Sequence, residues 1–381
     1  MDRCDALIVG GGPAGSTCAW KLRQAGLDVV VVDAAVFPRE KPCAGWITPQ
    51  VLTELRLDVE EYQQGRTFQP ITGFRVGLIG GEREVHTAYG HPVSFGIRRC
   101  EFDHYLLQRS GARLMLGAPV ASLRKHGGDW VVNDSIRAPI LIGAGGQFCP
   151  VARWINGPLN AAPLVVAQEA EVPIDQVNLA SCAIDGEVPE LYFCRDLKGY
   201  GWCVRKGAFL NVGLGRLDRR SLPDATAAFV AYLSAKARIS PRAPWRWRGH
   251  AYALSNLPRR RIVGAGVMLV GDAAGLAYPQ SGEGIRPAVE SGLLAADAIA
   301  DAHGQDLESR LQAYEERLRT RLAAGSLSGS LPGIVPVDLG TAIARRLLAV
   351  PMFVRRLVLD QWFLHRHEPA LASGGFPPAS R

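Results

Sequence analysis

Short apolar runs separated by glycines mark the beginning of this chain. Residues 6–9 and 29–32 contain only Ala, Leu, Ile and Val, which is typical of strands buried on both faces of a parallel sheet. Between them, residues 14–25 have the pattern of a helix that ends at Gly26. Strand, helix and strand together span about 30 residues, and this length predicts a βαβ unit.

Strand patterns dominate the middle of the chain. Residues 74–87 alternate around Gly80-Gly81, which predicts a hairpin. From 164 to 217 the clearest pattern is a pair of strands at 200–204 and 209–212, joined by Arg205-Lys206-Gly207. These segments predict a second, largely antiparallel sheet.

The last third is mostly helical by pattern. Residues 268–270 form one more buried strand, and a long helix is expected from about 282 to 302. One face of a following helix carries large apolar side chains at helical spacing: Leu307, Leu311, Tyr314, Leu318 and Leu322. A Gly/Ser/Pro break at 325–336 then precedes a basic, apolar helix pair.

Composition narrows the class of protein. With 48% hydrophobic and 21% charged residues, the 381-residue chain is globular, and its length suggests two lobes. The eight cysteines form no C-x-x-C pair, which argues against zinc ribbons and iron–sulfur ligation, so no metal site is expected. We read them as reduced thiols of a cytoplasmic protein. No run of 18 apolar residues occurs, so no membrane-spanning helix is expected. The net charge of +7 is concentrated near the end of the chain, and no nucleic-acid motif accompanies it.

The first chemical motif is Gly10-x-Gly12-Pro13-Ala14-Gly15, which follows a strand and opens a helix. Gly10 permits a tight turn, Gly12 lets a pyrophosphate approach the backbone, and Gly15 lets helix pack on strand. The helix N-terminus then offers N–H groups to the anion. Asp33 ends the next strand, where a ribose hydroxyl needs an acceptor. The motif predicts dinucleotide binding; a glycine-rich turn without a ligand is the alternative.

A second motif identifies the dinucleotide. The strand at 268–270 leads into Gly271-Asp272, and Gly282-Glu283-Gly284-Ile285 opens the next helix. A carboxylate at Asp272 suits the ribityl chain of a flavin, which NAD lacks. The helix N-terminus would stabilise an anionic reduced ring at its N1/C2=O edge. Both motifs together predict FAD.

These residues resemble FAD enzymes of the p-hydroxybenzoate-hydroxylase-like fold, and most of all the geranylgeranyl reductase family. The match covers residues 6 to 303 and leaves the last 78 without support. It rests on five blocks: the glycine motif with Asp33, Lys41-Pro42-Cys43-Ala44-Gly45, Arg99-x-x-Phe102-Asp103-x-x-Leu106, Gly199-Tyr200-Gly201-Trp202 through Asn211-Val212-Gly213, and Gly271-Asp272 through Gly284-Ile285.

The resemblance implies roles for several residues. Arg99 would contact the flavin phosphate or ribityl region; a surface salt bridge at a helix start is the alternative. Cys43, with Ala44 and Gly45, would lie beside the isoalloxazine ring and affect flavin reduction or substrate placement. The alternative for Cys43 is a small buried thiol.

An apolar channel is implied for the substrate. Tyr200 and Trp202 stand two apart on a strand and so share a face; they would line this channel with Pro279. Ordinary core packing of aromatics is the alternative. Cys43 and Tyr200 are also the candidates for catalysis, because no His or carboxylate in the sequence identifies itself as the proton donor.

Three blocks depart from the family pattern. Val204-Arg205-Lys206 stands where Phe-Pro-Lys is usual, Ala44-Gly45 where two glycines are usual, and Ala144-Gly145-Gly146-Gln147 where many relatives carry Asp-Gly. These departures leave the substrate open.

The expected fold class is α/β: a Rossmann-type FAD-binding domain interleaved with a β-sheet substrate domain, plus C-terminal helices. The FAD-binding domain would comprise 1–72, 96–160 and 255–303. The substrate domain would comprise 73–95 and 161–254. Residues 304–381 would form the C-terminal helical region.

The expected function is FAD-dependent reduction of carbon–carbon double bonds in an apolar isoprenoid-like or related natural-product substrate. A flavin monooxygenase of the same fold and a flavin-free prenyl-lipid carrier are the alternatives. Only one complete glycine fingerprint is present, so NAD(P)H from solvent or an electron-transfer protein is expected as reductant. The basic, apolar segment 341–367 predicts either contact with an anionic membrane surface or a helical lid on the substrate domain.

Overall fold

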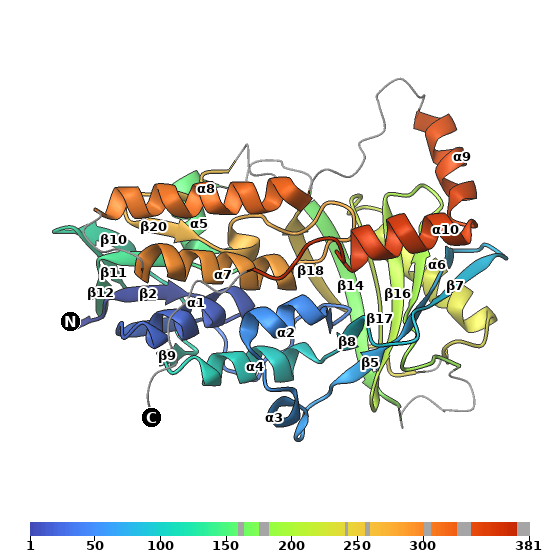
Figure 1. Ribbon diagram of the computed structural model, residues 1–381, viewed down its shortest axis with the longest axis horizontal. Helices are drawn as coiled ribbons and strands as arrows, with labels where there is room; N and C mark the ends of the chain where they lie inside the picture. Colours follow the sequence, from blue (N-terminus) through green and yellow to red (C-terminus); the bar gives the residue numbers. More distant parts are fainter. Residues whose placement is uncertain are drawn as a thin grey trace.

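Two large sheets lie side by side along the long axis of the molecule (Figure 1). The structure is a computed structural model that describes residues 1–158, 164–174, 183–240, 243–255, 260–300, 306–325 and 337–371. The predicted end of the 282–302 helix and nearly all of the predicted break at 325–336 lie outside these residues.

The first large sheet has six strands and carries the predicted βαβ unit. Its order is β19 (Val263–Gly264), β20 (Val267–Leu269), β13 (Ile140–Gly143), β2 (Ala6–Val9), β3 (Val29–Asp33) and β9 (Arg113–Leu116). All neighbours pair in parallel except β19 with β20. The residues of β2 and β20 are buried throughout, as their apolar runs predict. This Rossmann-type sheet confirms the predicted α/β class.

Helices cover this sheet. They are α1 (Pro13–Gln24), α4 (Arg99–Arg109), α5 (Pro150–Asn156), α7 (Ile285–Ala300) and α8 (Leu307–Gly325). The predicted apolar face of α8 is confirmed: Leu311, Tyr314 and Leu318 are buried in the same hydrophobic core as the sheet. Helix α1 packs directly on α7, which joins the beginning of the chain to a segment that starts at Ile285.

The second large sheet has seven strands. Its order is β18 (Arg248–Ala253), β14 (Leu164–Pro173), β17 (Phe209–Arg216), β16 (Gly199–Lys206), β15 (Glu190–Phe193), β6 (Gly73–Leu78) and β7 (Glu84–Ala88). The predicted hairpin is β6–β7, and α6 (Leu222–Ala235) packs on β14 and β17. The pairing is antiparallel except between β15 and β6.

One turn in this sheet differs from the prediction. Strand β16 continues through Lys206, so the reversal falls after it rather than at 205–207. Lys206 is 1% exposed, and its Nζ lies 2.6 Å from Glu171 Oε2 on β14. A buried cation needs a carboxylate partner, and the extended strand places Lys206 beside one.

Smaller elements complete the architecture. A four-stranded sheet contains β1 (Asp2–Arg3), β12 (Ile136–Ala138), β11 (Asp129–Val132) and β10 (Leu123–His126), and a three-stranded one contains β4 (Trp46–Ile47), β8 (Ser94–Gly96) and β5 (Gln69–Ile71). The remaining helices are α2 (Pro49–Leu55), α3 (Val59–Gln63), a 3₁₀ turn η4 (Gly271–Ala273), α9 (Val337–Leu347), α10 (Pro351–Phe353) and a π-helix η5 (Val354–Phe363).

The C-terminal helix η5 rests on the seven-stranded sheet. Val354, Val358 and Phe363 of η5 are buried in one cluster with Phe74 of β6 and Val204 of β16. One face of this segment therefore docks on the sheet, as the lid interpretation requires. Within the described part of the chain, no helix combines the length and apolarity needed to cross a membrane.

Candidate functional site

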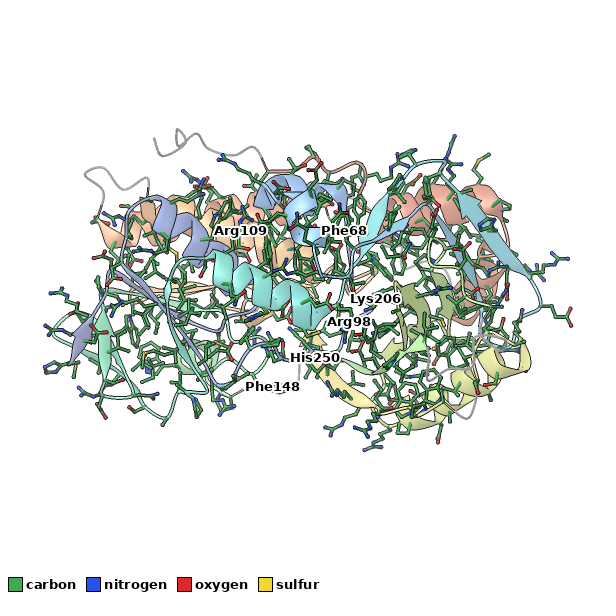
Figure 2. The ribbon with its side chains drawn as sticks, turned by 90° about the horizontal axis from the view of Figure 1, so that it is seen from below. Phe68, Arg98, Arg109, Phe148, Lys206 and His250 are labelled. Carbon is green, nitrogen blue, oxygen red and sulfur yellow. The ribbon has the colours of Figure 1, made fainter. Side chains whose placement is uncertain are left out.

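A cavity of about 680 Å³ lies between the two large sheets and is lined by residues from both. Figure 2 shows Arg98, Phe148, Lys206 and His250 close to this junction. The cavity is lined by every site residue that the sequence predicted except Gly15 and Pro279. The predicted residues that line it are Gly10, Gly12, Pro13, Ala14, Asp33, Cys43, Ala44, Gly45, Arg99, Tyr200, Trp202, Gly271, Asp272, Gly282, Gly284 and Ile285.

The glycine turn at one end of the cavity is shaped by close backbone contacts. Gly10 has φ +114°, and a Cβ there would lie 2.4 Å from the Ala144 carbonyl carbon. A Cβ at Gly15 would lie 1.9 Å from the Gly10 oxygen. Gly15 therefore lets α1 pack against the turn from beneath the cavity, which explains its place outside the lining.

The N-terminus of α1 faces this end of the cavity without a side-chain cap. Gly12 is the N-cap residue and makes no capping hydrogen bond, and Pro13 occupies the first turn. Asp33 is held nearby by two backbone donors, Gly11 N–H at 2.7 Å and Ala35 N–H at 2.8 Å. The arrangement suits an anion with a neighbouring hydroxyl group.

A buried guanidinium–carboxylate pair forms the side wall. Arg99 donates to both oxygens of Asp103 at 2.8 and 2.7 Å, and Arg39 lies 3.2 Å from the same carboxylate. Arg99 and Asp103 are 7% and 0% exposed, so the alternative of a surface salt bridge is wrong. Burial acts to raise the pKa of Asp103, but Arg99 and Arg39 outweigh it and lower the pKa below its usual range.

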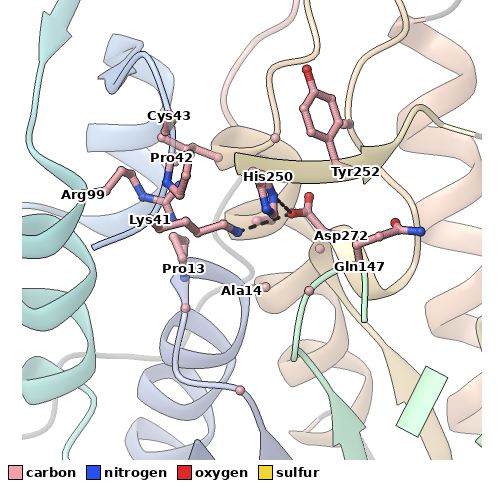
Figure 3. A pocket seen from close by; sticks show the side chains of 18 of the residues that line it. Pro13, Ala14, Lys41, Pro42, Cys43, Arg99, Gln147, His250, Tyr252 and Asp272 are labelled. Carbon is pink, nitrogen blue, oxygen red and sulfur yellow. Dashed lines mark hydrogen bonds and ion pairs between the residues drawn. The ribbon is translucent and has the colours of Figure 1, made fainter. Parts of the chain in front are cut away.

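Asp272 lies within the cavity, and two basic side chains approach the same oxygen of its carboxylate (Figure 3). Its Oδ2 lies 3.4 Å from Lys41 Nζ and 3.8 Å from His250 Nε2. Burial opposes ionisation of Asp272, yet Lys41 and His250 hold the pKa of its carboxyl well below the usual range. Burial lowers the pKa of His250, with the Asp272 hydrogen bond opposing the shift. The carboxylate is therefore ionised and remains a hydrogen-bond acceptor.

Two hydrogen bonds fix the backbone of Cys43. Its N–H donates to Glu169 Oε2 at 2.7 Å, and its carbonyl accepts from Asn211 Nδ2 at 3.3 Å. Glu169 is almost fully buried on β14, and this burial raises its pKa to about 7. The loop carrying Cys43, Ala44 and Gly45 is thus attached to the seven-stranded sheet.

Aromatic rings enclose the opposite end. Tyr200 and Trp202 share a face of β16, as predicted, and both line the cavity while packing with the core. The Tyr200 ring centroid lies 6.1 Å from Trp202 and 5.2 Å from Phe363. The Tyr200 hydroxyl donates to the Ser281 carbonyl, and burial raises the Tyr200 pKa well above its usual value.

Pro279 does not fit the predicted substrate role, because it is exposed on the outer side of its loop. Gly282 N–H donates to Tyr278 O at 2.8 Å, and Tyr278 N–H donates to Glu283 O at 2.9 Å. This tight turn directs Tyr278 inward and leaves Pro279 at its tip.

The lining residues that sequence reasoning missed include Arg39, His250, Tyr252 and Phe363. His250 and Tyr252 lie on edge strand β18, and Phe363 comes from the segment beyond the family resemblance. The sequence gives one indication that His250 and Tyr252 belong together: they stand two apart in a strand and so share a face. Their approach to Asp272 depends on the pairing of β18 with β14.

The chain is similar to several known proteins. Residues 8–59 match the model of an NAD(P)-binding Rossmann-like domain. The chain is 30% identical to a menaquinone reductase of Mycobacterium tuberculosis, over 78% of this chain and 77% of that protein. It is also 30% identical to a digeranylgeranylglycerophospholipid reductase of Methanothrix thermoacetophila, over 83% of each.

A solved structure has the same fold. A geranylgeranyl bacteriochlorophyll reductase-like protein from Thermoplasma acidophilum superposes with a TM-score of 0.71 at 22% identity. The match covers 92% of this chain and 88% of that one.

Proposed function

Because this chain belongs to the geranylgeranyl reductase and menaquinone reductase family of FAD-dependent oxidoreductases, we propose that it saturates a carbon–carbon double bond in an isoprenoid chain of a lipid or quinone. The observation that carries this proposal is one continuous cavity, polar at the glycine turn and aromatic at Tyr200, Trp202 and Phe363. The polar end fits the anionic half of a cofactor, and the aromatic end fits a planar ring together with an apolar substrate.

The residues present fit FAD. The uncapped N-terminus of α1 with Gly12 would hold the pyrophosphate, and Asp33 the ribose. Asp272 would accept from the ribityl hydroxyls, and Gly284 leaves space beside it, since a Cβ there would lie 3.2 Å from Asp272 Oδ1. Arg39, beside Gly12 and with one buried nitrogen lacking a hydrogen-bond partner, would add a donor to the phosphates.

FAD, when bound and reduced, supplies a hydride to the double bond. The chain itself would position the ring and the substrate and exclude water from the space between them. The Cys43 loop, fixed by Glu169 and Asn211, would orient the ring, and Tyr200, Trp202 and Phe363 would hold the isoprenoid chain next to it. We propose NAD(P)H or an electron-transfer protein as the source of electrons.

An anaerobic half-reaction tests the function. Enzyme loaded with FAD and reduced with dithionite is mixed with geranylgeranyl diphosphate, a menaquinone and an archaeal-type geranylgeranyl glycerophospholipid. Reoxidation of the flavin, with a product that carries two additional hydrogens in its isoprenoid chain, is expected for at least one. Failure with all three, together with oxygen-dependent hydroxylation of a substrate, would favour a monooxygenase; failure to bind FAD would favour a carrier.

We also propose that the outer face of the C-terminal segment contacts an anionic membrane. Arg345, Arg346, Arg355 and Arg356 are exposed there, and Met352 is 65% exposed. Removing residues 341–381 would uncover the cavity, because Phe363 lines it. The test is therefore co-sedimentation of R345E/R346E and wild type with phosphatidylglycerol vesicles. Charge reversal should lower vesicle binding, whereas equal binding by both proteins would contradict the proposal.

A further inference from the structure

A row of titratable side chains runs from the surface to the cavity through the end of the described chain. His367, which is exposed, has Nε2 3.6 Å from Glu368 Oε1. The same oxygen lies 3.1 Å from His365 Nδ1. His365 Nε2 lies 3.9 Å from Glu283 Oε2. Glu283 belongs to the Gly282–Gly284 turn that lines the cavity. Together these four residues are called the Glu283–His367 row.

The two inner members face each other with unused hydrogen-bonding capacity. Glu283 Oε2 and His365 Nε2 are both buried, and neither has a hydrogen-bond partner. His365 is 2% exposed, and its ring stacks on Tyr278 at a centroid distance of 3.8 Å. Buried polar atoms are rarely left unpaired, so this pair needs an explanation, and a proton passing between the two atoms provides one.

The outer carboxylate determines which His365 nitrogen is available. Burial acts to raise the pKa of Glu368, but His365, Arg286 and Arg321 lower it below the usual range. An ionised Glu368 accepts from Nδ1–H, which leaves Nε2 toward Glu283. A carboxylate fixes the tautomer of a catalytic histidine in the same way in serine hydrolases.

The inner carboxyl is disposed to carry a proton. Burial raises the pKa of Glu283; His365 and Arg286 oppose this shift and Glu290 of α7 adds to it. The Tyr278 hydroxyl donates to Glu368 Oε2 at 3.3 Å, and the Tyr278 and Tyr200 hydroxyls both lie near enough to feel the charge of Glu283. Tyr200 is a poor donor because its hydroxyl is bonded to the Ser281 carbonyl and its pKa is strongly raised.

Saturating a double bond requires one proton besides the hydride. We infer that Glu283 donates this proton and that His365, held in place by Glu368, returns one to it. The inference rests on the proposed function. The hydride of reduced FAD forms one new C–H bond, the π electrons and the proton of Glu283 form the other, and the O–H bond of Glu283 breaks. Its carboxylate then takes the Nε2 proton of the protonated His365 ring, which keeps its Nδ1–H on Glu368. After the product leaves, Nε2 takes a proton from water that enters the cavity.

The first test needs no substrate. Protein labelled with ¹⁵N-histidine is titrated between pH 5 and 9, with FAD bound and oxidised, and the His365 signal is assigned by its loss in H365Q. In wild type the His365 signals should report the protonation of Glu283, which faces the ring. E283Q should remove this change, while E316Q, on the exposed face of α8, should keep it. Identical His365 signals in E283Q and wild type over the whole pH range would overturn the inference.

The second test uses the dithionite-reduced enzyme and geranylgeranyl diphosphate. E283Q should slow substrate-dependent reoxidation of the flavin by ~100-fold or more, without changing FAD affinity or thermal unfolding. E283D should restore part of the rate, and H365Q should lower the rate and flatten its pH profile. Reoxidation of E283Q at the wild-type rate would refute the role of Glu283. If wild type itself is not reoxidised, the proposed function fails for this substrate, and the histidine titration alone decides on the row.

Discussion

Asn211 connects the Cys43 loop to the sheet beneath it through four contacts of a single side chain. Its Nδ2 lies within hydrogen-bond distance of the Cys43 carbonyl, Glu169 and Glu171, and its Oδ1 accepts from Trp202 Nε1 at 2.7 Å. Glu169 closes the network by accepting from Cys43 N–H. A network of this kind is rigid only while every member is paired. Removing one member should therefore loosen the Cys43 loop, which lines the cavity.

We therefore predict that E169A loosens the Cys43 loop. It leaves the part-buried Cys43 N–H without its acceptor, at a cost of about 1–3 kcal/mol. Urea unfolding should show this loss, and titration with FAD should show weaker binding. E316A is the matched control, because Glu316 is exposed on α8. Wild-type values for both properties in E169A would show that the network does not position the loop.

At the level of elements, glycines determine how closely helices approach their neighbours. Gly15 of α1 lies over the Gly10 carbonyl, and a Cβ at Gly292 of α7 would lie 2.5 Å from the Ala14 oxygen. Helix α1 is thus held between the glycine turn and α7. Both contacts involve backbone, which cannot rotate away as a flexible side chain can.

G15A should accordingly shift α1 away from the turn. Overpacking against backbone typically costs about 1–3 kcal/mol, and the displaced helix N-terminus should bind FAD more weakly. Calorimetric melting and FAD titration measure the two effects. G249A serves as control, because a Cβ at exposed Gly249 would meet only one atom, at 3.9 Å. Equal losses in G15A and G249A would contradict the steric argument.

On the scale of the whole molecule, the end of the chain holds the lobes together. Phe363 packs on Trp46, Phe193 and Tyr200, with ring centroids 5.2 to 6.5 Å apart. Further along, Arg286 of α7 donates to the carbonyls of Glu368 and Pro369 at 3.0 Å. Glu54 of α2 accepts from Leu371 N–H at 3.1 Å. These contacts make the terminal segment part of the cavity wall.

Glu54 should make this closure sensitive to pH. Burial, together with nearby Glu290, raises its pKa to about 8, while Arg286 opposes the shift. The folded protein then binds a proton that the unfolded chain releases near pH 4.5. Stability should therefore fall as pH rises from about 4.5 to about 8.

The variant E54Q removes this titration and should lose less stability over the same range. Its melting temperature should thus rise relative to wild type as pH increases. Thermal melts at pH 5 and pH 8 measure the change, with E316Q as the exposed control. An E54Q advantage that is equal at both pH values would contradict the assignment.

The sequence by itself determined the elements whose cause is local. The buried runs at 6–9 and 29–32, the glycine turn and the apolar face of α8 are all present in the structure, because backbone sterics and hydrophobic periodicity act between near neighbours in the chain. The family, and with it FAD and the oxidoreductase class, followed from such blocks.

Tertiary structure alone decided the charge partners and the closure of the cavity. Nothing in the sequence pairs Arg99 with a buried rather than an exposed Asp103, brings His250 to Asp272, or inserts Phe363 beside Tyr200. These contacts join segments whose distance in space depends on strand order and helix packing. Burial then changes the energy of each charge, so the chemistry of the site is a property of the assembled fold.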